Sequence, residues 1–349
     1  MINSPVRASR GTTPVTVNVG VIGVGMIGKD HIRRLTTVLA GAAVTAVTDV
    51  NPEEARQVAA GVPGDAAAHT TGQELIDDDA VDAIVVCSWG PTHEEYVLAA
   101  IAAGKPVFCE KPLATTQDAC RRIIDAEVAF GRRLVQVGYM RRYDAAYRGL
   151  KAVIESGDIG TPTMIHSTHR NPSVPGHYTR EMAITDTAVH DIDVVRWLLS
   201  DEVVGARVLK PRKNSLGGDL EDPLFILLEM AGGALVDIET NVNIRYGYDI
   251  RGEVVGETGT ASLGAGGPIT VRRNNLVADG VPADWRERFI GAYDVEFQEW
   301  IDAVRDGATF GPSSWDGYAA AVVSDAAVEA LHSGERVAVE LIDKPALYS

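Results

Sequence analysis

The sequence predicts an α/β protein in two parts: an N-terminal α/β domain with a parallel sheet and a C-terminal α+β domain with a large, mostly antiparallel open sheet. Three observations favour this fold class. The chain has 349 residues, more than one hydrophobic core usually organises. Short β-branched runs alternate with helical stretches as far as about Val137, and strand patterns then follow one another with short turns. We expect the first domain over residues 15–140 and the second over residues 141–349.

The first domain should consist of βαβ units, because its strand patterns are separated by longer segments with helical spacing. Helices are expected, for example, at Glu94–Ala103 and Thr116–Phe130. The candidate strands are Val17–Ile22, Ala43–Thr48, Ala83–Cys87, Val107–Cys109 and Arg133–Val137. This alternation indicates a parallel sheet.

The second domain begins with a helix at Tyr147–Glu155 and then changes pattern. Its strand candidates are Thr163–Thr168, Val203–Leu209, Leu224–Met230, Ala234–Asn241, Arg251–Val255 and Ile269–Arg273. Short turns between them, such as Ala231-Gly232-Gly233, are typical of antiparallel pairing. One helix, at about Ile184–Leu199, interrupts the strands. Two more helices, near Val295–Arg305 and Gly317–His332, follow the strands and could pack back on the first domain.

Composition and charge narrow the possible partners. The net charge of -16 repels phosphate backbones and anionic lipids, so we expect neither nucleic acid nor a membrane as a partner. The sequence has no apolar run of membrane-spanning length and no signal peptide, and we expect a cytoplasmic protein with a disordered extension over residues 1–14. The three cysteines, Cys87, Cys109 and Cys120, have no CxxC spacing and predict neither disulfides nor zinc.

A glycine-rich turn follows the first strand directly, with the sequence Gly23-Val24-Gly25-Met26-Ile27-Gly28. A bare GxGxxG pattern is weak, but here it lies between a strand and a helical stretch. The first glycine permits the tight turn, the second lets a pyrophosphate approach the backbone, and the third lets the helix pack on the strand. The helix N-terminus then favours the anion. The turn therefore predicts a Rossmann dinucleotide-binding domain, with a purely structural turn as the alternative.

Asp49 ends the second strand about twenty residues after the last glycine, where an acid can bind the ribose hydroxyls. The alternative is that Asp49 caps the next helix, although Asn51, followed by Pro52, can serve as that cap. No arginine follows Asp49 to neutralise a 2'-phosphate. The sequence therefore favours NAD over NADP.

Two further groups of residues are candidates for the chemistry. Asp186 and His190 are four residues apart in a helical pattern and can share a face, where an imidazole could accept the proton of an alcohol. An isolated pair of this kind is more often a surface pair. Glu110-Lys111-Pro112 follows a strand of the first domain, and ligands of α/β sheets bind at such strand ends. The ammonium of Lys111 could stabilise an oxygen that becomes negative in the reaction. The alternative for Lys111 is a solvated turn lysine.

A metal site is not expected. His166 and His169, with His177, could suggest one, but residues three apart in a strand point to opposite faces. No cysteine or nearby carboxylate completes a ligand shell. We therefore predict a site without a metal.

The chain resembles the glucose-fructose oxidoreductase and inositol dehydrogenase (Gfo/Idh/MocA) family. The resemblance covers nearly the whole chain and rests first on Val19–Gly28, on residues 109–116 (CEKPLATT) and on the Asp186–His190 helix. It narrows to the inositol dehydrogenase branch through residues 25–31 (GMIGKDH), 88–91 (SWGP), 136–144 (QVGYMRRYD), 169–172 (HRNP), 246–249 (YGYD) and 315–318 (WDGY).

This resemblance implies the roles of particular residues. Lys111, Asp186 and His190 would form the catalytic set, with His190 as general base, Asp186 orienting it and Lys111 holding the substrate oxygen. The residues implied in substrate binding are Met140, Arg141, His169 and one of Tyr246 or Tyr248, with Tyr248 our choice. Besides the glycine turn with Met26 and Ile27, the residues implied along the cofactor are Ser88, Trp89, His93, Glu110 and Lys111.

The resemblance also implies the activity: NAD-dependent oxidation of a ring hydroxyl of a cyclic polyol, with myo-inositol converted to 2-keto-myo-inositol (scyllo-inosose) as the leading candidate. Family members are typically homotetramers that pair their open sheets. The chain departs from the pattern in its longer N-terminal extension and at Ser173–Arg180 beside the expected pocket. The alternatives are therefore a dehydrogenase for another inositol isomer or a pyranose sugar, and a non-catalytic NAD-binding regulator.

Overall fold

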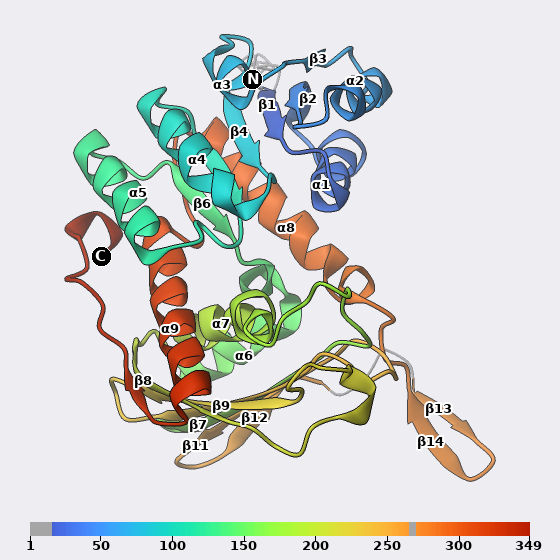
Figure 1. Ribbon diagram of the computed structural model, residues 1–349, viewed down its shortest axis with the longest axis vertical. Helices are drawn as coiled ribbons and strands as arrows, with labels where there is room; N and C mark the ends of the chain where they lie inside the picture. Colours follow the sequence, from blue (N-terminus) through green and yellow to red (C-terminus); the bar gives the residue numbers. More distant parts are fainter. Residues whose placement is uncertain (1–15, 265–269) are drawn as a thin grey trace, which may run out of the picture.

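The computed structural model describes residues 16–264 and 270–349 and shows two domains with separate sheets (Figure 1). The first domain has a six-stranded sheet in the order β3-β2-β1-β4-β5-β6, and every pair of neighbours is parallel. Its strands are β1 (Val17–Ile22), β2 (Ala42–Thr48), β3 (Ala67–Ala68), β4 (Ala83–Val86), β5 (Val107–Glu110) and β6 (Val135–Gly138). The predicted parallel sheet is confirmed, and the two-residue β3 was not predicted.

Three helices of this domain, α2, α3 and α5, begin at a polar side chain that caps the first turn. Asn51 accepts hydrogen bonds from the backbone of the first turn of α2, and Thr116 does the same for α5. The helices are α1 (Met26–Thr37), α2 (Pro52–Gly61), α3 (Gly72–Asp77), α4 (His93–Ala102) and α5 (Gln117–Phe130), with a short turn η1 (Gly90–Thr92) before α4. The expected helices near α4 and α5 are thus present within one residue of their predicted ends.

The second domain has a seven-stranded sheet in the order β12-β11-β7-β10-β9-β8-β15. Its pairs are antiparallel except β7 with β10, which are parallel. The strands are β7 (Pro162–Arg170), β8 (Val203–Leu209), β9 (Leu224–Met230), β10 (Leu235–Asn241), β11 (Asp249–Gly256), β12 (Thr260–Ser262) and β15 (Val337–Ala338). The prediction of a mostly antiparallel sheet is confirmed.

The hairpin of β13 (Thr270–Arg273) and β14 (Leu276–Asp279) stands apart from the large sheet. Figure 1 shows it projecting from the lower end of the molecule. The predicted strand there began at Ile269, which lies outside the described residues, as does the predicted extension over residues 1–14.

Helices of the second domain cover one face of the large sheet, and α6, α7 and α9 lie above it in Figure 1. Two α-helices are close to prediction, α6 (Ala145–Ser156) and α9 (Ser314–Ser333), whereas α8 (Trp285–Arg305) matches its predicted segment only at the C-terminal end. The helix predicted at Ile184–Leu199 is instead a π-helix, η3 (Ala183–Ala188), followed by α7 (Val189–Leu199). Short turns complete the chain: η2 (Met140–Tyr143), η4 (Ser215–Gly217) and η5 (Ala346–Tyr348).

The helix α8 joins the two domains through apolar contacts. It starts ten residues earlier than predicted because Asp284 caps it. Its Phe297, Trp300 and Ile301 belong to the hydrophobic cluster that contains β1 and Phe108. None of the helices in the described part of the chain is both long and apolar enough to cross a membrane.

Candidate active site

The glycine turn after β1 leaves no room for side chains at two positions. Gly23 has a φ of 93°, and a Cβ there would lie 2.6 Å from the backbone nitrogen of Ser88 after β4. A Cβ on Gly28 would lie 2.0 Å from the carbonyl oxygen of Gly23. The turn therefore packs directly against the end of β4, and α1 begins at Met26 with its N-terminus open.

Asp49 holds the end of β2 against this turn. Its Oδ2 accepts the backbone N–H of Val24 at 2.8 Å, and its Oδ1 accepts the N–H of Asn51 at 2.9 Å. Asn51, not Asp49, caps α2, so the alternative that Asp49 serves only as this cap is wrong. Asp49 thus belongs to the turn, and its bond to a ribose stays a prediction.

Two adjoining cavities lie along the ends of the parallel strands. The first has a volume of about 660 Å³ and is bordered by Gly23, Gly25, Asp49, Ser88 and Trp89, among others. The glycine turn, the free helix N-terminus and the acid at the end of β2 fit a dinucleotide. This cavity shares Cys87 and Ser88 with the second cavity, so the two lie side by side.

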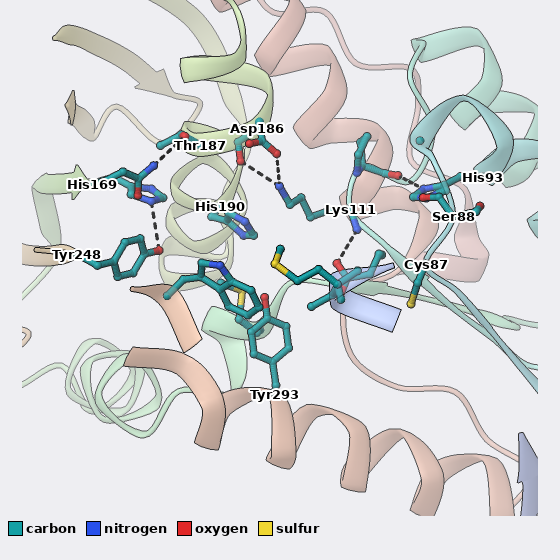
Figure 2. A pocket seen from close by; sticks show the side chains of 18 residues that line it. Cys87, Ser88, His93, Lys111, His169, Asp186, Thr187, His190, Tyr248 and Tyr293 are labelled. Carbon is teal, nitrogen blue, oxygen red and sulfur yellow. Dashed lines mark hydrogen bonds and ion pairs between the residues drawn. The ribbon is translucent and has the colours of Figure 1, made fainter. Parts of the chain in front are cut away.

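The second cavity, of about 340 Å³, lies between the two domains (Figure 2). Eleven of the predicted site residues line it: Met26, Ile27, Ser88, His93, Glu110, Lys111, Met140, His169, Asp186, His190 and Tyr248. They come from α1, α4, the end of β5 and the loops after β4 and β5, and from η2, η3, α7, β7 and the residue just before β11. The structure thus brings together residues that are far apart in the sequence.

The partner of Asp186 differs from the predicted one. The ammonium of Lys111 donates to Oδ1 of Asp186 at 2.6 Å and to its backbone oxygen at 3.1 Å. The prediction that Asp186 orients His190 is not supported by a hydrogen bond between these two residues in the structure. It assumed α-helical spacing, whereas Asp186 lies in the π-helix η3, which changes the side-chain direction. Burial alone would raise the pKa of Asp186, but Lys111 outweighs it and lowers that pKa.

His190 projects toward the second cavity near Lys111 and His169 (Figure 2). Among the residues that the structure describes, its buried Nδ1 has no hydrogen-bond partner. Burial, and then the positive charges of Lys111 and Arg141, lower the pKa of His190 well below its usual value. The imidazole is therefore neutral at neutral pH and able to accept a proton.

Arg141 lies behind the cavity rather than in it, so its predicted contact with substrate is wrong in this geometry. Its guanidinium donates to Asp191 at 2.6 Å and lies 2.8 Å from Nδ1 of His169. Asp191 also lies 2.8 Å from that nitrogen. Arg141 and Asp191, both nearly fully buried, hold His169, which does line the cavity with Tyr248.

His93 connects two loops of the site. Its Nδ1 lies 2.7 Å from the carbonyl oxygen of Pro112, and its Nε2 lies 3.0 Å from that of Ser88. It borders the second cavity but directs both ring nitrogens at the main chain. Tyr246, the other tyrosine considered, is half-exposed and bonded to Asp249, whereas Tyr248 is buried at the cavity with its hydroxyl 3.3 Å from His169.

Sequence reasoning did not assign seven residues that line the second cavity: Cys87, Gly90, Pro112, Asn171, Thr187, Trp285 and Tyr293. Asn171 belongs to a motif that the resemblance had singled out. Thr187 lies 2.6 Å from the hydroxyl of Tyr178, which connects the Ser173–Arg180 segment to the cavity. Trp285 and Tyr293 come from the first half of α8, for which no local signal had predicted a helix.

His166 and His169, two of the histidines that could suggest a metal site, lie on opposite faces of the strand β7. His166 is exposed and paired with Asp237, and His169 is buried on the opposite face. Within residues 16–264 and 270–349 no group of three or more His, Cys, Asp or Glu side chains is placed to hold a metal ion.

Comparison with known proteins agrees with this architecture. Residues 17–139 match the model of the oxidoreductase family with an NAD-binding Rossmann fold, and residues 151–339 match its C-terminal alpha/beta domain. The chain is 54% identical to inositol 2-dehydrogenase of Pseudomonas fluorescens (strain SBW25) over 96% of its length and 100% of that protein. It is also 54% identical to inositol 2-dehydrogenase 3 of Saccharopolyspora erythraea, over 96% of this chain and 98% of that one.

A solved structure provides the matching fold. The crystal structure of myo-inositol dehydrogenase from Lactobacillus casei in complex with NAD(H) and myo-inositol superposes with a TM-score of 0.94 at 40% identity. The match covers 96% of this chain and 100% of that one.

Proposed function

This chain belongs to the Gfo/Idh/MocA oxidoreductase family, and from that membership we propose that it oxidises one ring hydroxyl of a cyclic polyol with NAD. We propose myo-inositol as the substrate and 2-keto-myo-inositol as the product. Relatives at 54% identity that match nearly the whole chain are named inositol 2-dehydrogenases, which supports this choice.

One observation carries the proposal: a neutral buried imidazole and an ammonium face the same cavity, which adjoins the dinucleotide cavity. An alcohol oxidation needs a group that takes the hydroxyl proton and a group that stabilises the oxygen as it becomes negative. His190 and Lys111 are such groups. The presence of both in the same cavity speaks against the non-catalytic regulator.

Each residue of the site then has a separate role in the proposed oxidation. His190 accepts the hydroxyl proton, and the ammonium of Lys111 stabilises the negative charge on the oxygen. Asp186 holds that ammonium in place through its bond of 2.6 Å. Bound NAD supplies the acceptor for the hydride that leaves the carbon. His169 and Tyr248 contact other hydroxyls of the ring, and Arg141 with Asp191 fixes the orientation of His169.

The choice between polyols depends on residues around the second cavity. The Ser173–Arg180 segment reaches this cavity through Tyr178 and Thr187, and it is where the chain departs from the family pattern. Another inositol isomer or a pyranose sugar is the alternative substrate. Changes in this segment would then alter the ranking of substrates without altering the use of NAD.

We also propose a cytoplasmic homotetramer. The three cysteines are buried and free, which suits a reducing compartment. Met164 and Leu235, register partners on β7 and β10, are exposed on the sheet, and a second copy could cover them. Light scattering on the purified protein measures the mass directly, and a monomer would contradict this part of the proposal.

The substrate proposal is tested with a panel of polyols, sugars and hydroxy acids, in which absorbance at 340 nm follows NAD reduction. We expect myo-inositol, or a close isomer, to be turned over well ahead of glucose, lactate and malate. Comparable turnover of lactate or malate would refute a polyol pocket. Reduction of NAD by none of the compounds would favour the regulator.

A further inference from the structure

A chain of buried side chains runs from α1 to the second cavity. His31 on α1 is fully buried, and its Nε2 lies 2.7 Å from Oε1 of Glu110. Its Nδ1 lies 2.6 Å from a terminal nitrogen of Arg34. Arg34 also donates to Asp30 at 2.8 Å and to Asp294 at 2.7 Å. Glu110 ends β5 and borders the cavity, so this network connects the interior of the protein to the site.

The partners of His31 determine where its proton lies. A guanidinium only donates hydrogen bonds, so Nδ1 of His31 accepts from Arg34 and carries no proton. The proton therefore lies on Nε2, which donates to Glu110. Burial lowers the pKa of His31, despite the opposing effect of Glu110, in agreement with a neutral ring.

Glu110 consequently stays ionised. It accepts one bond from His31, and its Oε2 accepts the backbone N–H of Lys111 at 3.2 Å. Burial by itself would raise the pKa of Glu110, but the contacts with His31 and Lys111 outweigh burial and lower it. A buried carboxylate thus presents its charge at the edge of the cavity.

The charged side chains near Glu110 do not neutralise its carboxylate. Arg34 is shared with the carboxylates of Asp30 and Asp294, and Lys111 is paired with Asp186. On α8, Glu296 is fully buried, and neither of its oxygens has a partner within the described ranges of the chain. Burial, and then the charge of Glu110, raise the pKa of Glu296 well above its usual value, so Glu296 is neutral.

We propose that Glu110, held by His31, makes the protein bind the oxidised form of the nicotinamide cofactor more tightly than the reduced form. The ring is positively charged only when oxidised, and acceptance of a hydride removes that charge. A fixed carboxylate at the edge of a partly buried site attracts the charged form alone. This inference rests on the proposed function, because hydride transfer from a polyol in the second cavity requires the nicotinamide to reach that cavity, where Glu110 lies.

The test compares binding of NAD+ and NADH, without turnover, in wild type and Glu110→Gln. Calorimetry measures the Kd of NAD+, and fluorescence measures that of NADH. In the variant we expect the ratio Kd(NADH)/Kd(NAD+) to fall about tenfold, which is the change in relative affinity that the loss of one moderate charge–charge interaction causes. Glu299→Gln is the matched control, because it removes a carboxylate that is paired with Arg148 at the surface. Its ratio should equal that of wild type.

Two variants of His31 test its positioning role. The amide of His31→Gln can donate to Glu110 and accept from Arg34, so the ratio should stay near that of wild type. His31→Phe removes both bonds, and its ratio should move toward that of Glu110→Gln. If Glu110→Gln binds both forms with an unchanged ratio, the proposal is wrong and the function still stands. If wild type binds neither form, the proposed function fails as well.

Discussion

The two cavities of this protein are built in different ways. One side of the dinucleotide cavity is built from main chain, with the turn at Gly23 and the open N-terminus of α1, and the Asp49 carboxylate is bonded to that turn. The substrate cavity is formed by side chains from five or more elements of both domains. The first cavity is thus formed within the first domain alone, whereas the second exists only after the domains have packed together.

This difference predicts how each cavity responds to substitution. Removing a second-domain side chain from the substrate cavity should sharply reduce turnover and leave cofactor binding close to that of wild type. Removing one side chain from the dinucleotide cavity should change cofactor preference by a modest factor, because the glycine turn and the N-terminus of α1 remain in place.

The largest expected effect comes from His190→Ala. A positioned general base contributes about 10²- to 10⁴-fold, so turnover should fall on that scale. Cofactor binding should stay close to that of wild type, because His190 belongs to α7 of the second domain. Steady-state rates and NADH fluorescence titration measure the two quantities. His332→Ala, at an exposed position near the end of α9, is the control. Near-normal turnover would point to His169 as the base instead.

Lys111→Met should cause the next largest loss. The substitution keeps the apolar stem and removes the charge that would stabilise the oxygen. Loss of one such donor typically costs about 10²- to 10³-fold in kcat. The thermal midpoint should change little, because the ion pair with Asp186 is half-exposed on the Asp186 side. Lys210→Met, at a surface lysine paired with Glu221, is the matched control. Unchanged turnover in a folded variant would make Lys111 an ordinary turn lysine.

What the sequence could predict also differs between the dinucleotide cavity and the substrate cavity. The parallel sheet of the first domain and the glycine turn with Asp49 at the end of the next strand could be predicted, because their signals lie within short local segments. The partner of Asp186 was not, since a π-helix is not evident from the spacing of apolar residues. Arg141 was assigned to substrate because it lies in a family-like motif. Its actual partners, Asp191 and His169, are 50 and 28 residues away, and no local pattern connects them.

Asp49→Ala tests the dinucleotide cavity and should have a smaller effect. The carboxylate accepts from the free ribose hydroxyls and repels a 2'-phosphate. Hydrogen bonds to a charged group are worth about 1.5–3 kcal/mol, so the preference for NAD over NADP, as the ratio of kcat/KM values, should fall at least about tenfold. Asn51→Ala, which removes only the cap of α2, is the control. A wild type that uses NADP better than NAD would overturn the assignment of Asp49.

The smallest expected effect is that of pH on the wild-type enzyme. An ordinary imidazole loses its proton near pH 6.5, and oxidation would accelerate through that range. Burial, followed by Lys111 and Arg141, lowers the pKa of His190 well below this value, so the base is already neutral at pH 6.5. A positively charged cofactor would lower that pKa further. The logarithm of kcat/KM for the polyol, measured at saturating NAD, should therefore be nearly flat from about pH 6.5 to 8 and fall only in more acidic solution. A fall with its midpoint near pH 6.5 that disappears in His190→Ala would contradict the effect of burial while keeping His190 as the base.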